Sequence, residues 1–407
     1  MHKPELLAPA GSLRMLQTAF DFGSDAIYLG APRYSLRVRN NEFHKIENIN
    51  NAIQQAHALN KKIYILTNIF AHHSKIKTFI KDIQNIVDLK PDAFIVSDPG
   101  IIELFQTHFE NVPLHLSVQA NTVNSSAIQF WKKNGISRVI LSRELSLNEI
   151  EIIRNDCPDI ELEVFIHGAL CIAYSGRCLI SGYFNHRDAN QGTCTNACRW
   201  EYKMYAEEKN RPNELMPFEE DENGSYLFNS KDLCALKHIE NLMKIGVDSF
   251  KIEGRTKSAY YVARVVQVYQ KAIDLILKGE KITDDLYYSL NLLSNRGYTD
   301  GFFARHSIQD YQNYERGYSL SHQAQYIGDV LEYDENKKLM HILVKNHFEV
   351  GDKIECIHPN GNIIKTIDFI QNEQGDYINV APGNGYHVWL NLERNLSGSF
   401  LAKINKT

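Results

Sequence analysis

The sequence predicts a (β/α)₈ barrel of the TIM type, followed by a small antiparallel β-barrel domain. Short apolar runs recur eight times between residues 5 and 253 and alternate with polar helical stretches, which is typical of parallel strands joined by crossover helices. One long insertion interrupts the alternation after the seventh run. From Tyr326 onward, short alternating segments separated by Asn, Gly, Asp and Pro predict antiparallel strands.

Eight runs are the number that closes such a barrel. They are Glu5 to Ala8, Asp25 to Leu29, Lys62 to Asn68, Asp92 to Ser97, Leu114 to Gln119, Arg138 to Ser142, Ile160 to His167, and Asp248 to Glu253. Gly23, Gly135 and Gly246 precede three of the runs and predict helix ends in the left-handed conformation. An open doubly wound sheet is the alternative, but no Gly-x-Gly-x-x-Gly follows the first run, where Ser12 instead predicts a helix N-cap.

The domain boundaries follow from these patterns. We expect the barrel domain at residues 1–322, with the insertion at 168–232, and the β domain at 323–407. Helices are expected from about Arg264 to Lys278 and from Asp284 to Leu293. A chain of 407 residues suits two domains, because single cores stop growing near roughly 250 to 300 residues.

Composition restricts the classes of protein. The chain is 43% hydrophobic and 23% charged, and no apolar run approaches the ~20 residues that cross a bilayer. Its first residues show no secretory signal, so we expect a cytoplasmic protein that has no membrane contact and whose seven cysteines do not form a disulfide framework. The net charge of −5 argues against broad non-specific binding of nucleic acid but leaves room for a local basic face.

Four cysteines lie within the insertion, in the pattern C-x6-C-x15-C-x3-C: Cys171, Cys178, Cys194 and Cys198. Thiolates select zinc, copper(I) or iron–sulfur centres. The absence of paired C-x2-C knuckles favours a [4Fe–4S] cluster over structural zinc. The C-x3-C-x2-C arrangement of radical enzymes fails because Glu201 occupies its third position. Cys157 and Cys356 are expected in cores, while Cys234 is either a packing residue or an alternative fourth ligand.

Arginines and polar side chains recur at the carboxyl ends of the runs. Because the guanidinium fork pairs with carboxylates and phosphates, these arginines predict an anionic substrate, RNA, or both. The substrate-binding candidates are Arg33, Arg37, Arg39, Asn68, Gln119, Arg143, Arg177 and Arg255. His167 ends an apolar run four residues before Cys171, so it is a candidate for proton transfer or for donation to a cluster sulfur. Asn68 could instead cap the following helix.

Long segments of the chain resemble peptidase family U32, the collagenase-like protease family. They include ELLAPAGS, DAIYLGAPRYSLRVRNNEF, LSVQANTVN, RVILSRELS, FIHGALCIAYSGRCLISGY, GTCTNACRW, FNSKDLCAL and SFKIEGRTKSAYYVARVVQVY. The resemblance covers essentially the whole chain and is strongest to members that hydroxylate tRNA. It implies prephenate-dependent formation of 5-hydroxyuridine at the wobble position in the anticodon loop, with prephenate as co-substrate and a second protein of the same family as a potential partner.

The resemblance also implies a [4Fe–4S] cluster on Cys171, Cys178 and Cys194. Members differ in the fourth ligand, and we assign Cys198, with Cys234 as the alternative. A uridine stacked in the anticodon loop must be extruded to enter a barrel, and Tyr34, Tyr174 or Trp200 could stack on it. We assign catalytic roles to His167, Tyr174 and Glu253, and we expect the C-terminal β domain to add an RNA contact.

The peptidase activity in the family name finds little support in the residues. The sequence contains no His-Glu-x-x-His, and Ser175 lacks the first glycine of a Gly-x-Ser-x-Gly elbow. Two alternatives to RNA hydroxylation therefore stay open: a U32-type peptidase, and a noncatalytic RNA-binding protein with structural zinc.

Overall fold

A computed structural model describes residues 2–36, 42–109, 111–170, 178, 180–187, 189–192, 194–199, 205–207, 215–217, 231–304, 323–392 and 394–405. The chain forms two compact units. The first contains residues 1–16, 25–256 and 295–319, and the second contains residues 17–24, 257–294 and 320–407.

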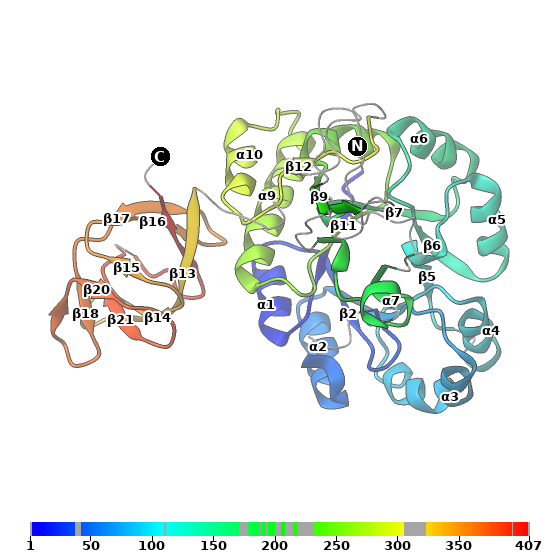
Figure 1. The fold of residues 1–407 in the computed structure, drawn as a ribbon, viewed down its shortest axis with the longest axis horizontal. Coiled ribbons are helices and arrows are strands. Elements are labelled where there is room, and N and C mark those ends of the chain that lie inside the picture. Colours follow the sequence, from blue (N-terminus) through cyan, green and yellow to red (C-terminus); the bar gives the residue numbers. More distant parts are fainter. Residues whose placement is uncertain are drawn as a thin grey trace. The chain divides into compact units, whose positions relative to one another are not determined.

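The first unit contains a closed barrel of eight parallel strands, as the sequence predicts (Figure 1). The last strand pairs in parallel with both the first and the seventh, which closes the ring. The strands are β1 (Glu5–Pro9), β2 (Ala26–Gly30), β3 (Lys62–Thr67), β4 (Ala93–Val96), β5 (Leu114–Leu116), β6 (Ile136–Ile140), β7 (Glu161–Ala169) and β11 (Ser249–Ile252). Each of the eight apolar runs overlaps one of these strands.

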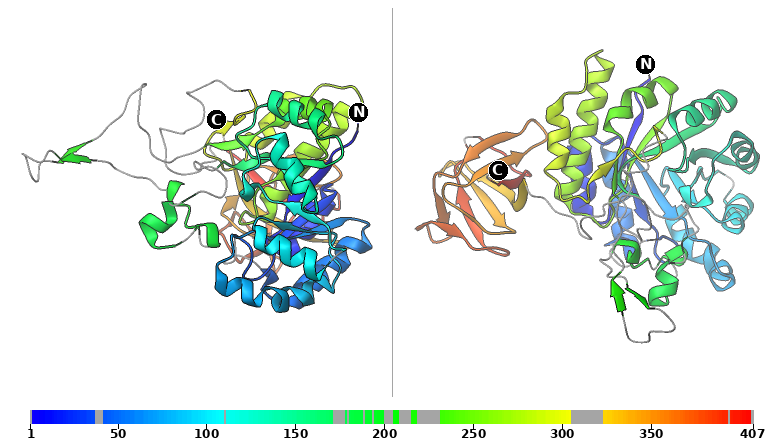
Figure 2. Two further views of the ribbon diagram at one scale, coloured as in Figure 1. Left: turned by 90° about the vertical axis from the view of Figure 1, so that its right-hand side faces the viewer. Right: turned by 45° about the horizontal axis from the view of Figure 1, so that its top comes forward.

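Helices alternate with the strands and surround them, as the two views of Figure 2 show. They are α1 (Leu13–Asp21), α2 (Ile46–Ala58), α3 (His73–Val87), α4 (Pro99–His108), α5 (Ser125–Lys133), α6 (Leu147–Asp156) and α8 (Ile239–Ile245). Their ends follow local rules. Ser146 and Glu149 form a capping box at the start of α6, and Ser12 accepts a hydrogen bond from the backbone N–H of Met15. The three expected glycines, Gly23, Gly135 and Gly246, have φ of +108°, +75° and +87°.

An extension of the sheet follows the seventh strand. The end of β7 pairs antiparallel with β10 (Asp232–Cys234), which pairs in turn with β12 (Tyr298–Thr299). A buried ion pair between Arg296 and Asp232 reinforces this edge. The described parts of the insertion are α7 (Ile180–Asn185), η3 (Ala189–Gln191), η4 (Ala197–Arg199), and the antiparallel pair β8 (Tyr205–Glu207) and β9 (Leu215–Pro217).

The second unit combines a β domain with α9 (Ala259–Leu277) and α10 (Asp284–Asn291). Arg264 of α9 pairs with Glu355, and Tyr260 stacks on Tyr326 with ring centroids 4.9 Å apart. These contacts explain why the two helices group with the strands. The domain boundary near residue 322 stays a prediction.

The antiparallel character of the C-terminal strands is confirmed. The main sheet has the order β17-β16-β22-β13-β14-β21-β18-β19, and β15 pairs with β20. The strands are β13 (Ala324–Asp334), β14 (Leu339–Val344), β15 (Phe348–Glu349), β16 (Lys353–Ile357), β17 (Ile363–Thr366), β18 (Ile370–Asn372), β19 (Tyr377–Ile378), β20 (Val380–Ala381), β21 (His387–Leu390) and β22 (Phe400–Ile404). Cys356 lies in their core and Cys157 is buried in the first unit, as expected. Within the described residues, no helix has the length and hydropathy needed to span a bilayer.

Candidate active site at the carboxyl ends of the barrel strands

The carboxyl ends of β7 and β11 bring three of the candidate residues together. His167 is 1% exposed and lies opposite Cys234 on one side and Ile252 on the other. The backbone N–H of Glu253 donates to the carbonyl oxygen of His167 at 2.9 Å. The expected proton-transfer residue, the alternative cysteine ligand and the candidate acid therefore occupy adjacent positions on neighbouring strands.

Gly168 permits the close approach of these two strand ends. Its φ is +111°, and a Cβ atom there would lie 2.5 Å from the carbonyl oxygen of Glu253. Any side chain at this position would therefore push Glu253 away from His167. A glycine directly after the candidate histidine is a requirement of the site geometry.

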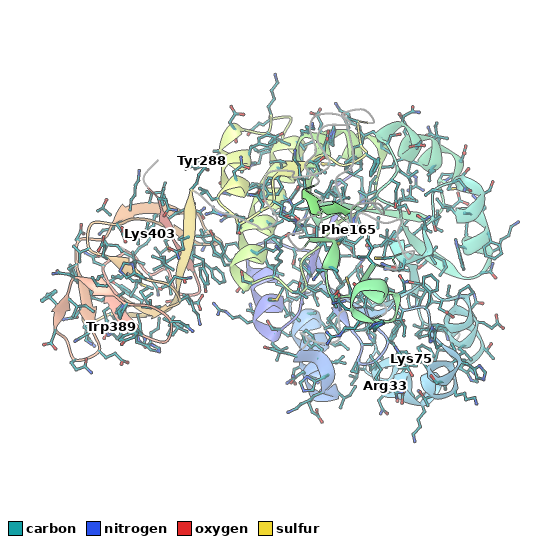
Figure 3. The ribbon with its side chains drawn as sticks, in the orientation of Figure 1. Arg33, Lys75, Phe165, Tyr288, Trp389 and Lys403 are labelled. Atoms are coloured by element: carbon teal, nitrogen blue, oxygen red, sulfur yellow. The ribbon has the colours of Figure 1, made fainter. Side chains whose placement is uncertain are left out.

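Two arginine side chains lie at the same end of the barrel. Arg143, which follows β6, forms an ion pair with Glu253, and its guanidinium lies 3.8 Å from the centroid of the Phe165 ring. Phe165 lies at the centre of the ring of strands in Figure 3. Arg255 lies over the end of β2, where a Cβ on Gly30 would be 2.2 Å from one guanidinium nitrogen. Two guanidinium groups thus accompany one carboxylate at the barrel mouth.

Asn68 directly follows β3 and contains a buried polar atom without a partner. Its amide nitrogen donates to the hydroxyl of Ser117 at 3.3 Å, whereas its Oδ1 accepts no hydrogen bond in the structure. An unsatisfied buried acceptor is unfavourable unless a ligand or water supplies a donor. Gln119 follows Ser117 on the short helix η2 (Val118–Ala120). Asn68 does not cap α3, whose N-cap is His72.

The side chain of Arg33 forms an ion pair with a residue of α3. Its guanidinium pairs with Asp82 of α3 at 2.6 Å, with the arginine side chain 55% exposed, and Lys75 donates to its carbonyl oxygen (Figure 3). The hydroxyl of Tyr34 also donates to Asp82, and Tyr34 is buried against Phe79. Tyr34 is therefore a packing residue, and the expectation that it could stack on an extruded base is wrong.

Buried charges inside the barrel were not anticipated from the sequence. The Lys251 ammonium lies 2.7 Å from Glu163 and 4.5 Å from the centroid of the Tyr28 ring. Arg138 pairs with Glu163 at 3.2 Å and with Glu5 at 2.6 Å. Their signal was present in the printed sequence, because charged residues occupy positions within otherwise apolar strands.

Burial and neighbouring charges shift the pKa values of this interior. Burial lowers the pKa of Lys251, and Glu163 offsets part of that change. Burial also raises the pKa of Tyr28, assisted by the carboxylate of Glu253. The pKa of His115 is well below its ordinary value because the ring is buried near Arg138 and Lys251. The pKa of the Tyr28 hydroxyl responds both to Glu163 in the barrel interior and to Glu253 at the barrel mouth.

Among the described cysteines of the insertion, Cys194 has hydrogen-bond donors around its sulfur that suit a thiolate ligand. The backbone N–H of Asn196 donates to the Sγ of Cys194 at 3.4 Å, and the Ser181 hydroxyl donates to the same sulfur at 3.8 Å. Such donors stabilise the negative charge on a ligating sulfur. Cys178, Cys198 and Cys234 are also outside any disulfide. The surroundings of Cys194 suit a ligating sulfur, whereas the iron–sulfur cluster itself and the choice between Cys198 and Cys234 stay predictions.

Five candidates lie outside the described residues: Arg37, Arg39, Cys171, Tyr174 and Arg177. Their expected roles stay predictions. Trp200, the third proposed stacking residue, also lies outside the described part.

Comparison with known proteins identifies the family. Residues 11–313 match the family described as Peptidase family U32, and residues 322–402 match the Peptidase family U32 C-terminal domain. The chain belongs to peptidase family U32. The chain is 51% identical to tRNA hydroxylation protein P of Escherichia coli strain K12, over 97% of this chain and 95% of that protein. It is 49% identical to the protein of the same name in Haemophilus influenzae, over 97% of this chain and 94% of that protein.

More distant similarities extend to a curated protein and a solved structure. The chain is 28% identical to the 23S rRNA 5-hydroxycytidine C2501 synthase of Escherichia coli, over 100% of this chain and 61% of that protein. Among solved structures, the C-terminal domain of a Geobacillus thermoleovorans putative U32 peptidase is 26% identical, covering 19% of this chain and 98% of that chain with a TM-score of 0.19.

Proposed function

We propose that this U32 chain is a tRNA-modifying enzyme that hydroxylates the wobble uridine to 5-hydroxyuridine in a prephenate-dependent reaction. The observation that carries the proposal is the match of about half identity, over almost the full length of both chains, to proteins named for tRNA hydroxylation. The relative named for rRNA hydroxycytidine synthesis supports the broader class of pyrimidine hydroxylation in RNA.

The arginines of the barrel mouth suit an anionic co-substrate. Prephenate is a dicarboxylate, and each guanidinium can bind one carboxylate through two parallel N–H donors. Arg143 is held by Glu253 and by the face of Phe165, so its fork is oriented before a ligand arrives. Arg255 lies against Gly30 at the carboxyl end of β2. In this proposal the two arginines bind the donor and the strand ends between them receive the base.

Asn68 would make the barrel mouth selective for uracil over cytosine. Its unpartnered Oδ1 needs a hydrogen-bond donor, and the N3–H of an extruded uridine is one. Cytosine carries no hydrogen at N3 and would leave the oxygen unsatisfied in that pose. The hydrogen bond from Asn68 to Ser117 holds the amide in place.

His167 is placed to accept a proton. His167 would hold or accept a proton during hydroxylation, because it lies buried at the end of β7 beside Glu253 and Cys234. A [4Fe–4S] cluster held by Cys171, Cys178, Cys194 and either Cys198 or Cys234 would supply electron transfer at this end of the barrel. The N–H donor of Asn196 and the O–H donor of Ser181 would stabilise the negative charge on Cys194 as a ligand.

The proposal is tested by mass spectrometry of tRNA nucleosides from a strain lacking the gene. The deletion should abolish 5-hydroxyuridine and its derivatives, and the wild-type gene should restore them. An Asn68→Asp variant keeps the shape of the side chain and its acceptor, whereas Asn68→Leu removes the acceptor and should prevent restoration. An unchanged nucleoside profile in the deletion strain would refute the function.

The cofactor is tested separately, on protein purified without oxygen. Iron and sulfide in equal amounts, with the broad visible absorbance of an iron–sulfur cluster, are expected, and both should decrease in Cys194→Ala. Stoichiometric zinc with neither iron nor sulfide would instead support a noncatalytic RNA-binding protein.

Proteolysis is the second candidate, because the matching family is described as a peptidase family. It requires that purified protein cleave gelatin in the presence of a metal chelator and that Cys171→Ala abolish the cleavage. Failure to cleave, together with loss of 5-hydroxyuridine in the deletion strain, would decide for RNA modification.

A further inference from the structure

Three polar side chains meet on the outward face of the C-terminal sheet, in the second unit. His341 lies on β14, His387 on the adjacent β21, and Glu373 in the turn directly after β18. The register places His341 opposite Trp389, and Gln371 opposite the same residue from the other side. Because side chains alternate along a strand, positions two residues apart share a face. His387, two residues before Trp389, and Glu373, two residues after Gln371, therefore lie on the face that holds His341.

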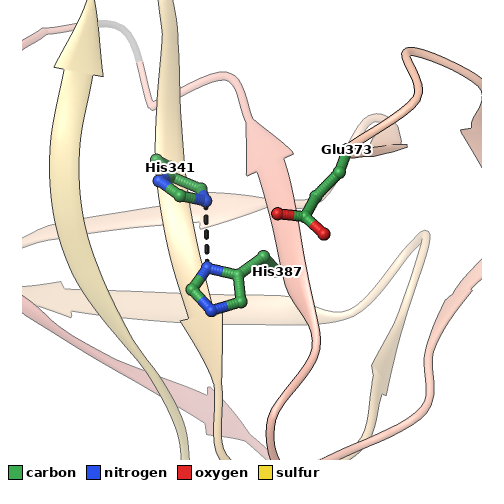
Figure 4. A group of neighbouring side chains, drawn as sticks. All are labelled: His341, Glu373 and His387. Carbon is green, nitrogen blue, oxygen red and sulfur yellow. Dashed lines mark hydrogen bonds between the residues drawn. The ribbon is translucent and has the colours of Figure 1, made fainter.

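The donor atoms of these side chains are close enough to share one ion. One ligand atom from each residue lies within 4.8 Å of the other two. The Nε2 of His341 and the Nδ1 of His387 are 3.0 Å apart, and the Glu373 carboxylate points toward this pair from the neighbouring turn (Figure 4). Ligands about 2.0 to 2.2 Å from a zinc ion are separated from each other by distances in this range, so small side-chain adjustments suffice.

A second carboxylate prepares His341 to be a ligand. Glu332 of β13 lies directly across from His341, and its Oε1 is 3.4 Å from the Nδ1 of that ring. A proton held on Nδ1 by Glu332 leaves the Nε2 lone pair facing His387 and Glu373. Metal-binding histidines commonly have a carboxylate in this position, which fixes the tautomer and increases the basicity of the ligating nitrogen.

The ring of His341 is also held by packing. It stacks on Trp389 with centroids 4.6 Å apart and an angle of 15° between the planes. The Lys337 ammonium lies 4.5 Å from the centroid of the same indole. An imidazole confined in this way loses little conformational freedom when it binds an ion.

We propose that His341, His387 and Glu373 form a binding site for a divalent transition-metal ion of the zinc class, with Glu332 as a positioning residue. Two imidazole nitrogens and one carboxylate suit Zn²⁺, Ni²⁺ or Cu²⁺ rather than Mg²⁺ or Ca²⁺, which prefer oxygen ligands alone. Three protein ligands leave a fourth position for water or an external group. The ion would connect three neighbouring segments of one sheet. This site contains no cysteine and is independent of the proposed function.

The direct test is titration of the full-length, metal-stripped protein with Zn²⁺. Cysteine thiolates can also bind zinc, so every protein in the comparison keeps its cysteines. The measured quantity is the difference in bound zinc between wild type and each histidine variant. Wild type should bind one equivalent more than His387→Gln and His341→Gln, measured by calorimetry and elemental analysis. His347→Gln is the matched control, because His347 is an exposed histidine of the same domain that lies outside the cluster. Equal stoichiometry in all four proteins would overturn the proposal.

A spectroscopic readout distinguishes this site from the cysteines. Ni²⁺ bound to His341 should quench the fluorescence of the stacked Trp389. The chain has three tryptophans, so Trp389→Phe should remove this quenching and Trp200→Phe should preserve it. Quenching that disappears only in Trp200→Phe would place the ion beside the cysteines and refute the site.

Two further variants keep the test decisive. Glu332→Gln should weaken zinc binding about 10-fold to 100-fold without removing the site. If a histidine variant fails to fold, Glu373→Gln replaces an exposed side chain and should weaken the same binding step. Zinc should raise the unfolding temperature of the full-length wild-type protein more than that of the full-length His387→Gln variant. Failure of both Glu373→Gln and His387→Gln to alter zinc binding would assign the cluster to hydrogen bonding and stacking alone.

Discussion

Replacing Arg138 by Met should destabilise the barrel more than any exposed charge substitution. Arg138 is 3% exposed and pairs with Glu5 at 2.6 Å, with Glu163 at 3.2 Å and with the half-exposed Glu161 at 2.7 Å. Met fills a similar length of space but leaves two buried carboxylates without this partner. Glu163 retains Lys251, and Glu5 retains the hydroxyl of Tyr64. Breaking a buried pair by removing one partner typically costs about 3 to 5 kcal/mol, and we expect that range here.

The assay is urea unfolding followed by circular dichroism, combined with hydrogen exchange of peptides from the barrel strands. Lys244→Met is the matched control, because Lys244 pairs with Glu240 at 2.5 Å on the surface of α8 and both side chains are more than half exposed. Removing that pair should cost about 0.5 kcal/mol or less. If Arg138→Met and Lys244→Met have equal effects, the interior charges do not stabilise the barrel and the reasoning is refuted.

Acidification provides a second measurement on the same variant. Burial acts to raise the pKa of Glu5, but Arg138 outweighs it and the net pKa is lowered. The stabilising contribution of this carboxylate is therefore present above its unfolded pKa and is lost as pH falls through the folded pKa. Without Arg138, burial raises the pKa of Glu5. The stability difference between wild type and Arg138→Met should therefore narrow as pH falls, beginning above the unfolded pKa of about 4.3, where Glu5 of the variant takes up a proton, and continuing below it, where wild type loses its ion pair. A difference that does not change with pH would contradict this electrostatic account.

The remaining predictions concern a strand end, a ligand and a buried histidine. Gly168→Ala should destabilise the protein by about 1 to 3 kcal/mol and abolish hydroxylation. Gly279 also has positive φ but open space around it, so Gly279→Ala should affect stability alone. Equal activity in the two variants would contradict the role of the close approach between Gly168 and Glu253. Arg143→Lys keeps the charge but loses the planar fork, so binding of prephenate measured by calorimetry should weaken at least about 10-fold, while Lys132→Arg should leave it unchanged. The folded pKa of His115 lies below its unfolded value, so the histidine costs stability as pH falls below about 6.5. His115→Phe should therefore gain up to about 1.4 kcal/mol relative to wild type per pH unit between pH 6.5 and 5.5. A constant difference would show that the pKa of His115 is the same in the folded and unfolded states and would contradict this account.

The barrel could be predicted because its signals are local and repeated. Each apolar run is short, ends at a polar residue or glycine, and recurs with a helix between, so the strand count follows from the sequence alone. The helix ends at Gly23, Gly135 and Gly246 follow from the same local chemistry. The grouping of α9 and α10 with the β domain was not visible, because it depends on contacts such as Arg264 with Glu355 between residues far apart in the chain.

The candidate site could be predicted only in part, for a related reason. Position after a strand correctly indicated that His167, Glu253 and Arg143 occupy one end of the barrel. The same rule could not show that the side chain of Arg33 pairs with Asp82 instead of joining Arg143 at the barrel mouth. The direction of a side chain after a strand depends on the local backbone, and Arg33 has a φ of +65°, which the sequence does not reveal. Cys234 appeared remote from His167 in sequence, and only the antiparallel return of β10 places them opposite each other.

The charge balance along the barrel interior differs from that at the mouth, which gives an acidic chain a locally cationic surface. Near the amino ends of the strands, Glu5 and Glu163 are matched by Arg138 and Lys251, so these buried side chains nearly neutralise one another. At the mouth, Arg143 and Arg255 accompany Glu253, so these three side chains have a net positive charge. The overall charge of −5 is carried by the molecule as a whole, and charges more than about 10 Å away are screened by physiological salt. If the proposed dicarboxylate binds at the mouth, its affinity should therefore depend on Arg143, Arg255 and Glu253 rather than on the net charge of the chain. Charge reversal at Glu253, by Glu253→Lys, would increase that local charge but would lose the partner that orients Arg143, so affinity for prephenate should fall despite the added cation.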